Sequence, residues 1–174
     1  MKNIFHRRKL GKTDYGKRKK LLSGNSPRIV FRRTNRYVIA QYVTTKEARD
    51  SIEIGITSKN LEKYGWPKEF AGSLRSITAA YLTGFLIGKK ILKEKKKVPI
   101  FDLGMISSAH KTRPYAFLKG LVDAGLKIEH DKKIFPEGDR IKGKHLKEDF
   151  SKTFEKIKAE IEKENWIWKI MIMN

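Results

Sequence analysis

The sequence predicts an α/β fold built on a mixed β-sheet with helices on its faces. Two β-branched and aromatic runs separated by Asn35-Arg36 indicate a hairpin, and a run of alternating isoleucines follows it. The second half of the chain then alternates between helical and strand patterns. An antiparallel first half joined to a helix-strand-helix second half is typical of a mixed sheet.

The first half of the chain contains the strands that we expect to be antiparallel. Residues Arg28–Thr34 (RIVFRRT) and Tyr37–Val43 (YVIAQYV) form the hairpin, because asparagine tolerates the backbone of a tight turn. Residues Ser51–Thr57 (SIEIGIT) alternate isoleucine with polar or small residues, which predicts a third, half-buried strand. The simplest assembly of the three is an antiparallel meander.

The hydrophobic period changes to that of a helix over Ala71–Leu92, where apolar residues form one broad face. Gly84 and Gly88 lie one turn apart in this helix, and each costs up to about 1 kcal/mol relative to alanine. We interpret them as the site of a close backbone approach to the sheet. The alternative is a weakness that the helix simply tolerates.

A short strand and a second helix follow the basic connector. Residues Val98–Leu103 are almost continuously apolar, which predicts a strand buried on both faces. Pro114 suits the first turn of a helix over Tyr115–Ala124, and Gly125 supplies its C-terminal stop.

The C-terminal part of the chain predicts a loop and then an amphipathic helix. Residues 126–146 read as an ordered surface loop. Apolar residues then recur at helical spacing and require a protein or RNA surface to lie against; they are Phe150, Phe154, Ile157 and Ile161. The apolar tail after Asn165 is too short to span a bilayer, and we expect it to dock on a neighbour or on the domain's own core.

The charge of the chain indicates a polyanionic partner. The 174 residues include 40 Lys+Arg against 19 Asp+Glu, a formal net charge of +21, and residues 1–36 contribute thirteen basic residues and one acidic residue. Such an arm commonly stays extended until a polyanion neutralises it, although a merely solvated basic face is the alternative. The absence of cysteine excludes disulfides, cysteine metal sites and thiol nucleophiles. We expect an intracellular, cytoplasmic protein without a membrane span.

Residues of three segments are candidates for RNA contacts. Cations of the arm can neutralise phosphates, with Tyr15 as a stacking residue between them; the cations are Arg7, Arg8, Lys9, Lys12, Lys17, Arg18, Lys19 and Lys20. Arg32, Arg33 and Arg36 gather guanidinium groups around the hairpin turn, although charged protection of a sheet edge is the alternative. The loop before the second helix offers hydroxyls, cations and the unpaired N–H groups of a helix start, with Ser107 or Thr112 as a plain N-cap in the alternative.

Two other function classes are weaker interpretations. A metal-dependent nuclease needs converging carboxylates, whereas Glu53, Asp102 and Asp123 show no clustered spacing, so Asp102 is better explained as a cap or loop ligand. A nonspecific basic nucleic-acid-binding module is the other class, and no helix-turn-helix or zinc-finger pattern supports it. We therefore expect no enzyme, no metal and no cofactor.

The order of segments resembles a known family. The string RKLGKTDYGKRKKLLSGNSPRIVFRRTNRYVIAQYV is followed by YGW, AYLTGFLIGKK, FDLG and AFLKGLVDAGLKIEH. Over about residues 7–145 this resembles the archaeal form of the 5S rRNA-binding protein of the large ribosomal subunit, number eighteen in the bacterial series. Glu129, where the family usually has proline, and the apolar tail depart from the pattern.

The resemblance implies more than the residue patterns do. It implies a five-stranded mixed sheet of ribonuclease H-like topology, and a role in attaching 5S rRNA to 23S rRNA in the central protuberance beside neighbouring ribosomal proteins. Together with the residue patterns it predicts a basic extended RNA-binding arm (1–27) and an α/β 5S rRNA-binding domain (28–146), followed outside the resemblance by an amphipathic helix and apolar C-terminal tail (147–174). The resemblance places four residues on the RNA-facing hairpin, although a plain exposed strand residue is the alternative for the last of them: Arg28, Arg32, Asn35 and Gln41. It also implies that His110, Lys111 and Arg113 contact 5S rRNA.

Overall fold

The protein is built on a four-stranded mixed sheet with the strand order β3-β2-β1-β4. The computed structural model describes residues 6–11, 13–47, 49–106, 109–145 and 150–173, the last nine by their backbone alone. Strand β2 pairs antiparallel with both β1 and β3, and the short β4 pairs parallel with β1. The strands are β1 (Arg28–Arg33), β2 (Val38–Lys46), β3 (Arg49–Thr57) and β4 (Ile100–Asp102).

This architecture confirms the mixed sheet, but not the expected number of strands. The described residues form four strands instead of five, and the ribonuclease H-like topology is not confirmed. After α4 (Arg113–Asp123) the chain carries charges and Pro136 rather than a β-branched run. It therefore folds as the 3-10 turn η3 (Lys132–Ile134) and the short helix α5 (Gly138–Lys142).

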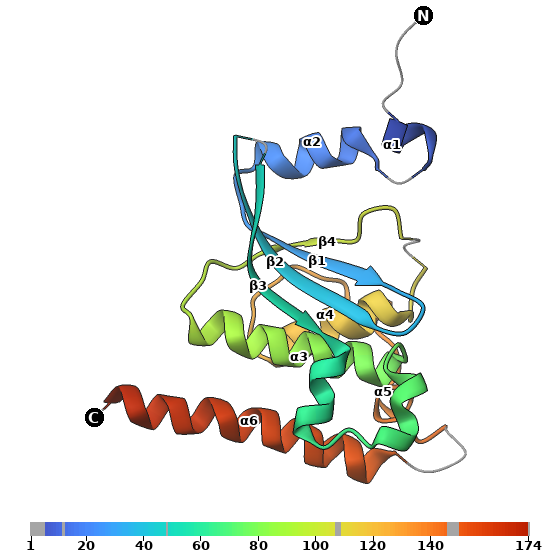
Figure 1. The fold of residues 1–174 in the computed structure, drawn as a ribbon, viewed down its shortest axis with the longest axis vertical. Coiled ribbons are helices and arrows are strands. Elements are labelled where there is room, and N and C mark those ends of the chain that lie inside the picture. Colours follow the sequence, from blue (N-terminus) through green and yellow to red (C-terminus); the bar gives the residue numbers. More distant parts are fainter. Residues whose placement is uncertain (1–5, 12, 48, 107–108, 146–149, 174) are drawn as a thin grey trace, which may run out of the picture.

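Helices cover one face of the sheet in two layers (Figure 1). Helices α3 (Ile77–Lys93) and α4 pack directly on the strands, and α6 (Ser151–Met173) packs on α3 from outside. The 3-10 segments η1 (Ser58–Tyr64) and η2 (Lys68–Ser73) lead from β3 to α3. No helix within the described residues is long and apolar enough to cross a bilayer.

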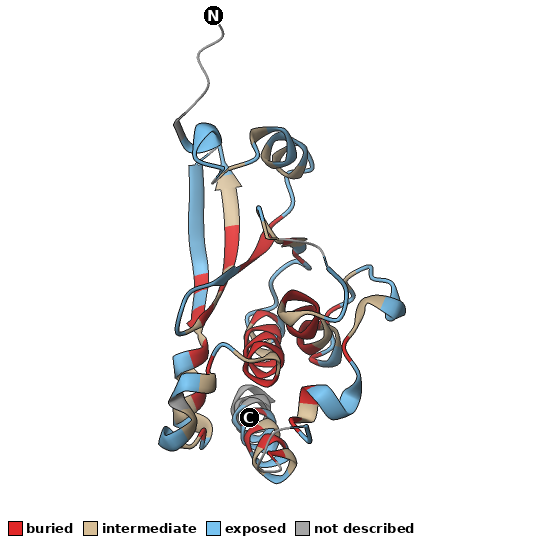
Figure 2. Cartoon of the chain, turned by 90° about the vertical axis from the view of Figure 1, so that its right-hand side faces the viewer, coloured by how far each residue is buried: buried red, intermediate tan, exposed pale blue. Residues whose placement is uncertain are grey.

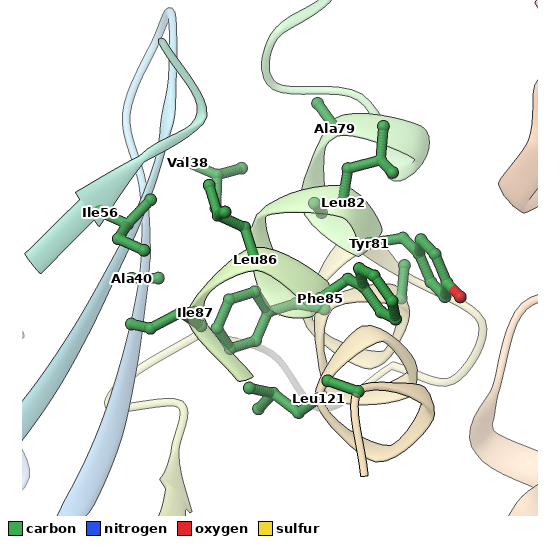
Figure 3. Packing of buried hydrophobic residues seen from close by; sticks show 14 of the residues in the cluster. Val38, Ala40, Ile56, Ala79, Tyr81, Leu82, Phe85, Leu86, Ile87 and Leu121 are labelled. Atoms are coloured by element: carbon green, nitrogen blue, oxygen red, sulfur yellow. The ribbon is translucent and has the colours of Figure 1, made fainter. Parts of the chain in front are cut away.

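Alternation along the strands decides which face is covered. Ile29 and Phe31 of β1 are fully buried, and in register with them Ala40 and Tyr42 of β2 point to the same face. Figure 3 shows Val38, Ala40 and Ile56 facing the apolar side chains of α3. The intervening residues, including Val30, Arg32, Gln41 and Ile52, therefore belong to the opposite face, which no layer of helices covers (Figure 2).

The paired glycines of α3 mark a close backbone approach, as predicted, but they lie against α4. The prediction that they approach the sheet was wrong. A Cβ atom on Gly84 would lie 2.2 Å from the carbonyl oxygen of Phe117, and one on Gly88 would lie 2.6 Å from Cβ of Ala124. Gly120 of α4 is the matching glycine on the facing helix, because a Cβ atom on it would lie 2.2 Å from the carbonyl oxygen of Tyr81 in α3. The two helix backbones touch because neither carries a side chain at the crossing.

Substitution Gly84→Ala is expected to destabilise the protein by about 3 kcal/mol, because backbone atoms have to move to admit the methyl group. Gly72→Ala is the matched control, since a Cβ there would meet no atom within 4 Å and the φ angle is ordinary. Urea unfolding followed by circular dichroism measures both. Equal stabilities of the two variants would contradict the close packing of α3 on α4.

The C-terminal apolar stripe is confirmed, and its surface is the protein's own. The four residues of the stripe are all buried, the first just before α6 and the others on it: Phe150, Phe154, Ile157 and Ile161. The Phe150 ring lies 4.9 Å from that of Trp66, and the Phe154 ring lies 5.4 Å from that of Tyr81. The side chains of the apolar tail after Asn165 lie outside the described residues, although its backbone continues α6.

Two local predictions were wrong. Residues Val98–Leu103 were expected to be buried on both faces, but β4 is an edge strand and Ile100 is 39% exposed. The arm was expected to be extended, but it forms the short helix α1 (His6–Lys9) and the helix α2 (Tyr15–Ser23). Asp14 caps α2 by accepting a hydrogen bond from the Lys17 N–H, which offsets part of the repulsion between cations.

Candidate nucleic-acid interface

A cleft separates α2 from the uncovered face of the sheet. Its volume is about 770 Å³. Figure 1 shows α2 lying across the far end of the strands from α3. No residue of α2 is fully buried. Basic and polar side chains from α1, α2, β1 and β2 line the cleft: Arg7, Lys17, Arg18, Arg28, Arg32 and Gln41. Three aspartates line it as well, namely Asp14, Asp50 and Asp102.

Two polar contacts join α2 to the sheet and to the loop after β4. The Arg18 guanidinium pairs with Asp50 at 2.8 Å, and the Lys17 ammonium donates to the carbonyl oxygen of Gly104 at 3.2 Å. Both contacts lie at the surface, where ion pairs contribute about 1 kcal/mol or less. The helix therefore remains easy to displace from the sheet by a competing polyanion.

A buried arginine anchors this network. Arg28 is 4% exposed, and its guanidinium donates to Asp102 at 2.9 Å and to Asp50 at 2.8 Å. Asp102 also accepts a hydrogen bond from the Gly104 N–H, which confirms it as a loop ligand. Because two carboxylates occupy Arg28, its predicted role as an RNA contact is not supported by its position, and it instead orients the surrounding groups.

The environment of Asp50 lowers the pKa of its carboxyl group. Desolvation alone would raise this pKa, but hydrogen bonds from Thr45 and Arg28 and the charges of Arg28 and Arg18 outweigh it. A carboxylate with a lowered pKa in the folded state stabilises the fold above its unfolded pKa, near 3.9. This contribution is lost as the pH falls through the lower, folded value.

With Asp50→Asn, the free energy of unfolding is therefore expected to fall less than in wild type as the pH is lowered from neutral to strongly acidic. The variant is less stable than wild type at pH 7, and the two converge as the pH falls below about 3.9. Thermal unfolding measured at several pH values tests this. A stability difference that stayed constant across the whole range would contradict the assigned ion pairs.

The hairpin turn presents its polar groups to solvent. The Thr34 hydroxyl donates to the carbonyl oxygen of Tyr37 and accepts from the N–H groups of Arg36 and Tyr37, which fixes the turn. Arg33, Asn35 and Arg36 are exposed around it. The hairpin thus holds cations on a rigid turn, as the sequence predicts.

The loop before α4 is tied to the segment that follows this helix. The Lys111 N–H donates to the carbonyl oxygen of Ile134 at 2.9 Å, and its ammonium pairs with Glu137 at 3.2 Å. His110 is exposed and meets the Tyr115 ring edge-on. The Thr112 hydroxyl donates to the carbonyl oxygen of Ala109 and makes no capping hydrogen bond to α4, while Ser107 lies outside the described residues.

The candidate residues fall into three places rather than one. Of the arm residues, Arg7, Tyr15, Lys17 and Arg18 lie beside Arg32 and Gln41 around the cleft. Four more arm cations are exposed but do not line the cleft, and Lys12 lies outside the described residues; the four are Arg8, Lys9, Lys19 and Lys20. The second place is the hairpin turn, and the third is the loop with His110, Lys111 and Arg113. The sequence did not predict a role for Asp50, because a single carboxylate at the start of a strand does not indicate that Arg18 and Arg28 will pair with it.

Carboxylates in the described part of the chain are used for structure. Glu53 pairs with Lys96 at 2.8 Å, and Asp123 pairs with Lys119 and accepts a hydrogen bond from Tyr81. Within that part no three His, Cys, Asp or Glu residues gather as ligands for a metal ion. The groups that a nuclease would need are thus dispersed and engaged elsewhere.

Comparison with known proteins identifies the family. Residues 1–101 match the model of the family described as ribosomal large subunit proteins 60S L5 and 50S L18. The chain belongs to this family. Membership makes it a structural component of the large ribosomal subunit rather than an enzyme, as the sequence predicts.

Similar proteins in archaea extend the match beyond residue 101. The large ribosomal subunit protein uL18 of Korarchaeum cryptofilum is 45% identical over 142 residues, which cover 82% of this chain and 71% of that protein. The protein of the same name from Methanoregula boonei is 40% identical over 166 residues, covering 92% of this chain and 93% of that protein. The resemblance to an archaeal family member is thereby confirmed.

Proposed function

We propose that this chain binds 5S rRNA and helps to attach it to 23S rRNA in the central protuberance of the large subunit. The observation that carries the proposal is the cationic cleft, in which a basic helix faces an uncovered sheet. An RNA strand or loop entering this cleft meets cations from both sides. It also meets the apolar and amide side chains of the sheet, on which unpaired bases can rest.

The residues around the cleft have separate roles in this proposal. The exposed arm cations and Arg32 bind phosphates. Gln41 in the cleft, and Asn35 outside it at the hairpin turn, donate and accept hydrogen bonds at base edges. Tyr15 supplies a stacking face. Arg28 acts indirectly, because its ion pairs fix Asp50, to which the arm is attached.

Further parts of the chain have roles outside the cleft. His110, Lys111 and Arg113 add a separate contact with rRNA beside the start of α4. The proposed division is an RNA-binding arm over residues 1–27, an α/β domain over 28–146 and an extension over 147–174. This extension is the part that faces neighbouring ribosomal proteins.

A titration with folded 5S rRNA and with duplex DNA of equal length tests the proposal. We expect steep salt dependence on both, since phosphate contacts release counterions from either polymer. A preference for 5S rRNA should survive as the salt concentration rises, because shape and unpaired bases do not depend on counterion release. Equal affinity for the two polymers at high salt would identify a nonspecific basic module instead.

A further inference from the structure

Four arginines from four separate segments converge at the hairpin end of the sheet. They are Arg33 at the end of β1, Arg75 just before α3, Arg113 at the start of α4 and Arg140 in α5. Figure 1 shows the β1-β2 turn and the starts of α3 and α4 at the same end of the molecule, with α5 beside them. We call these four residues the arginine cluster.

Contacts between the segments fix the arginine cluster in place. The Arg75 guanidinium donates to the carbonyl oxygen of Asn35 at 3.1 Å, which joins the start of α3 to the hairpin turn. Helix α5 packs on α3 through the buried side chain of Ile141. The cluster is therefore built on helices and a tight turn rather than on a free loop.

The charges of the arginine cluster have no acidic counterpart in the described part of the chain. No ion pair joins any of the four arginines to a carboxylate there. The carboxylates nearest in sequence to Arg140 are occupied, since Glu137 pairs with Lys111 and Asp139 pairs with Lys144 at 2.8 Å. Arg33, Arg75 and Arg140 are exposed and accessible to a ligand.

Arg113 is the central member of the arginine cluster. Its side chain is half-buried, and its Nε atom is buried without a hydrogen-bond partner. Burial and then the charges of Arg33, Arg75 and Arg140 lower the pKa of the Arg113 guanidinium. A buried donor without a hydrogen-bond partner is unfavourable, and so is the repulsion between neighbouring guanidinium groups. Binding of an anion beside them would reduce this repulsion.

We infer that the arginine cluster is a second RNA-binding surface, which grips a backbone phosphate of rRNA and to which Arg75 and Arg140 contribute. Guanidinium groups present paired N–H donors that match the non-bridging oxygens of a phosphate. Sequence patterns gave no signal for Arg75 or Arg140, because they are isolated in the chain and meet only in the fold. The inference rests on the proposed function and extends the contact at Arg113, outside the cleft, to Arg33, Arg75 and Arg140.

The test compares Arg75→Gln/Arg140→Gln with wild type in binding to 5S rRNA and, separately, to full-length 23S rRNA over a salt series. We expect affinity for one of these RNAs to fall about 10- to 100-fold, with a salt slope flatter by about one to two. A loss on 5S rRNA assigns the phosphate to 5S rRNA, and a loss on 23S rRNA alone assigns it to 23S rRNA. Arg75→Lys/Arg140→Lys, which keeps both charges, should retain the slope.

Lys97→Gln/Lys127→Gln is the matched control, because it removes two exposed positive charges that follow the C-terminal ends of α3 and α4, whereas Arg75 and Arg113 lie at the N-terminal ends of these helices. We expect the control to change affinity less than about 3-fold. If the glutamine variant at Arg75 and Arg140 bound both RNAs as the control does, the inference would be wrong. Failure of the proposed function is recognised separately, because wild type would then show no preference for 5S rRNA.

Discussion

Removal of residues 1–24 is expected to weaken binding to 5S rRNA by about 1000-fold at low salt and to flatten the salt dependence. The segment contains nine lysines and arginines against one aspartate, so it carries most of the phosphate contacts that we propose. Each phosphate that is no longer neutralised lowers the salt slope by about 0.7 to 0.9. Filter binding over a series of KCl concentrations measures both quantities.

The fold should survive this truncation. No residue of α2 is fully buried, and its polar contacts with the rest of the domain, made by Arg18 and Lys17, lie at the surface. The far-ultraviolet circular dichroism of the truncated protein should therefore lose only the signal of a short helix. Global unfolding would contradict the view that the arm is an RNA-binding attachment.

A variant with intact length controls for the loss of the helix itself. Substitution of glutamine for Lys17, Lys19 and Lys20 removes charge while the cap at Asp14 and the Arg18–Asp50 pair remain. We attribute the larger share of the truncation effect to charge if this variant reproduces much of the fall in slope. An unchanged slope would show that these three lysines do not face phosphates.

Short-range patterns in the sequence were sufficient for the hairpin and the C-terminal helix. The alternation in Arg28–Thr34 and Tyr37–Val43 and the turn between them depend on neighbours in the chain, and the structure confirms them. The same holds for Phe150, Phe154, Ile157 and Ile161, whose spacing defines one face of α6. The spacing of apolar residues in the sequence therefore predicts which side chains are buried when one face of a helix or strand is covered.

The wrong predictions concern contacts between distant parts of the chain. Gly84 and Gly88 signalled a close approach, but the partner was α4, because the complementary Gly120 is more than 30 residues away. The helical arm was missed because charge density suggested repulsion, whereas Asp14 caps the helix and Asp50 pairs with one of its cations. Arg28 was placed with the RNA contacts from the family resemblance, which carries no information on its ion pairs with Asp50 and Asp102 in this fold; its contact with RNA stays a prediction.

Replacement of Arg28 is expected to cost more stability than any other single substitution considered, about 4 kcal/mol for Arg28→Ala. The loss arises because Asp102, which is 4% exposed, would remain buried without its cation. Asp50 would keep the Arg18 guanidinium and the Thr45 hydroxyl and would suffer less. Urea unfolding at pH 7 measures the effect.

The double variant Arg28→Met/Asp102→Asn distinguishes two causes of the stability loss, namely a buried carboxylate without its cation and the loss of side-chain packing. Methionine retains much of the side-chain volume, and the asparagine oxygen still accepts from the Gly104 N–H. Because no carboxylate is then left buried without a partner, we expect the double variant to be more stable than Arg28→Ala by at least about 2 kcal/mol. If instead the double variant kept full stability yet lost affinity for 5S rRNA as strongly as the truncated protein, Arg28 would belong among the direct RNA contacts, and the assignment of its guanidinium to Asp50 and Asp102 would have to be abandoned.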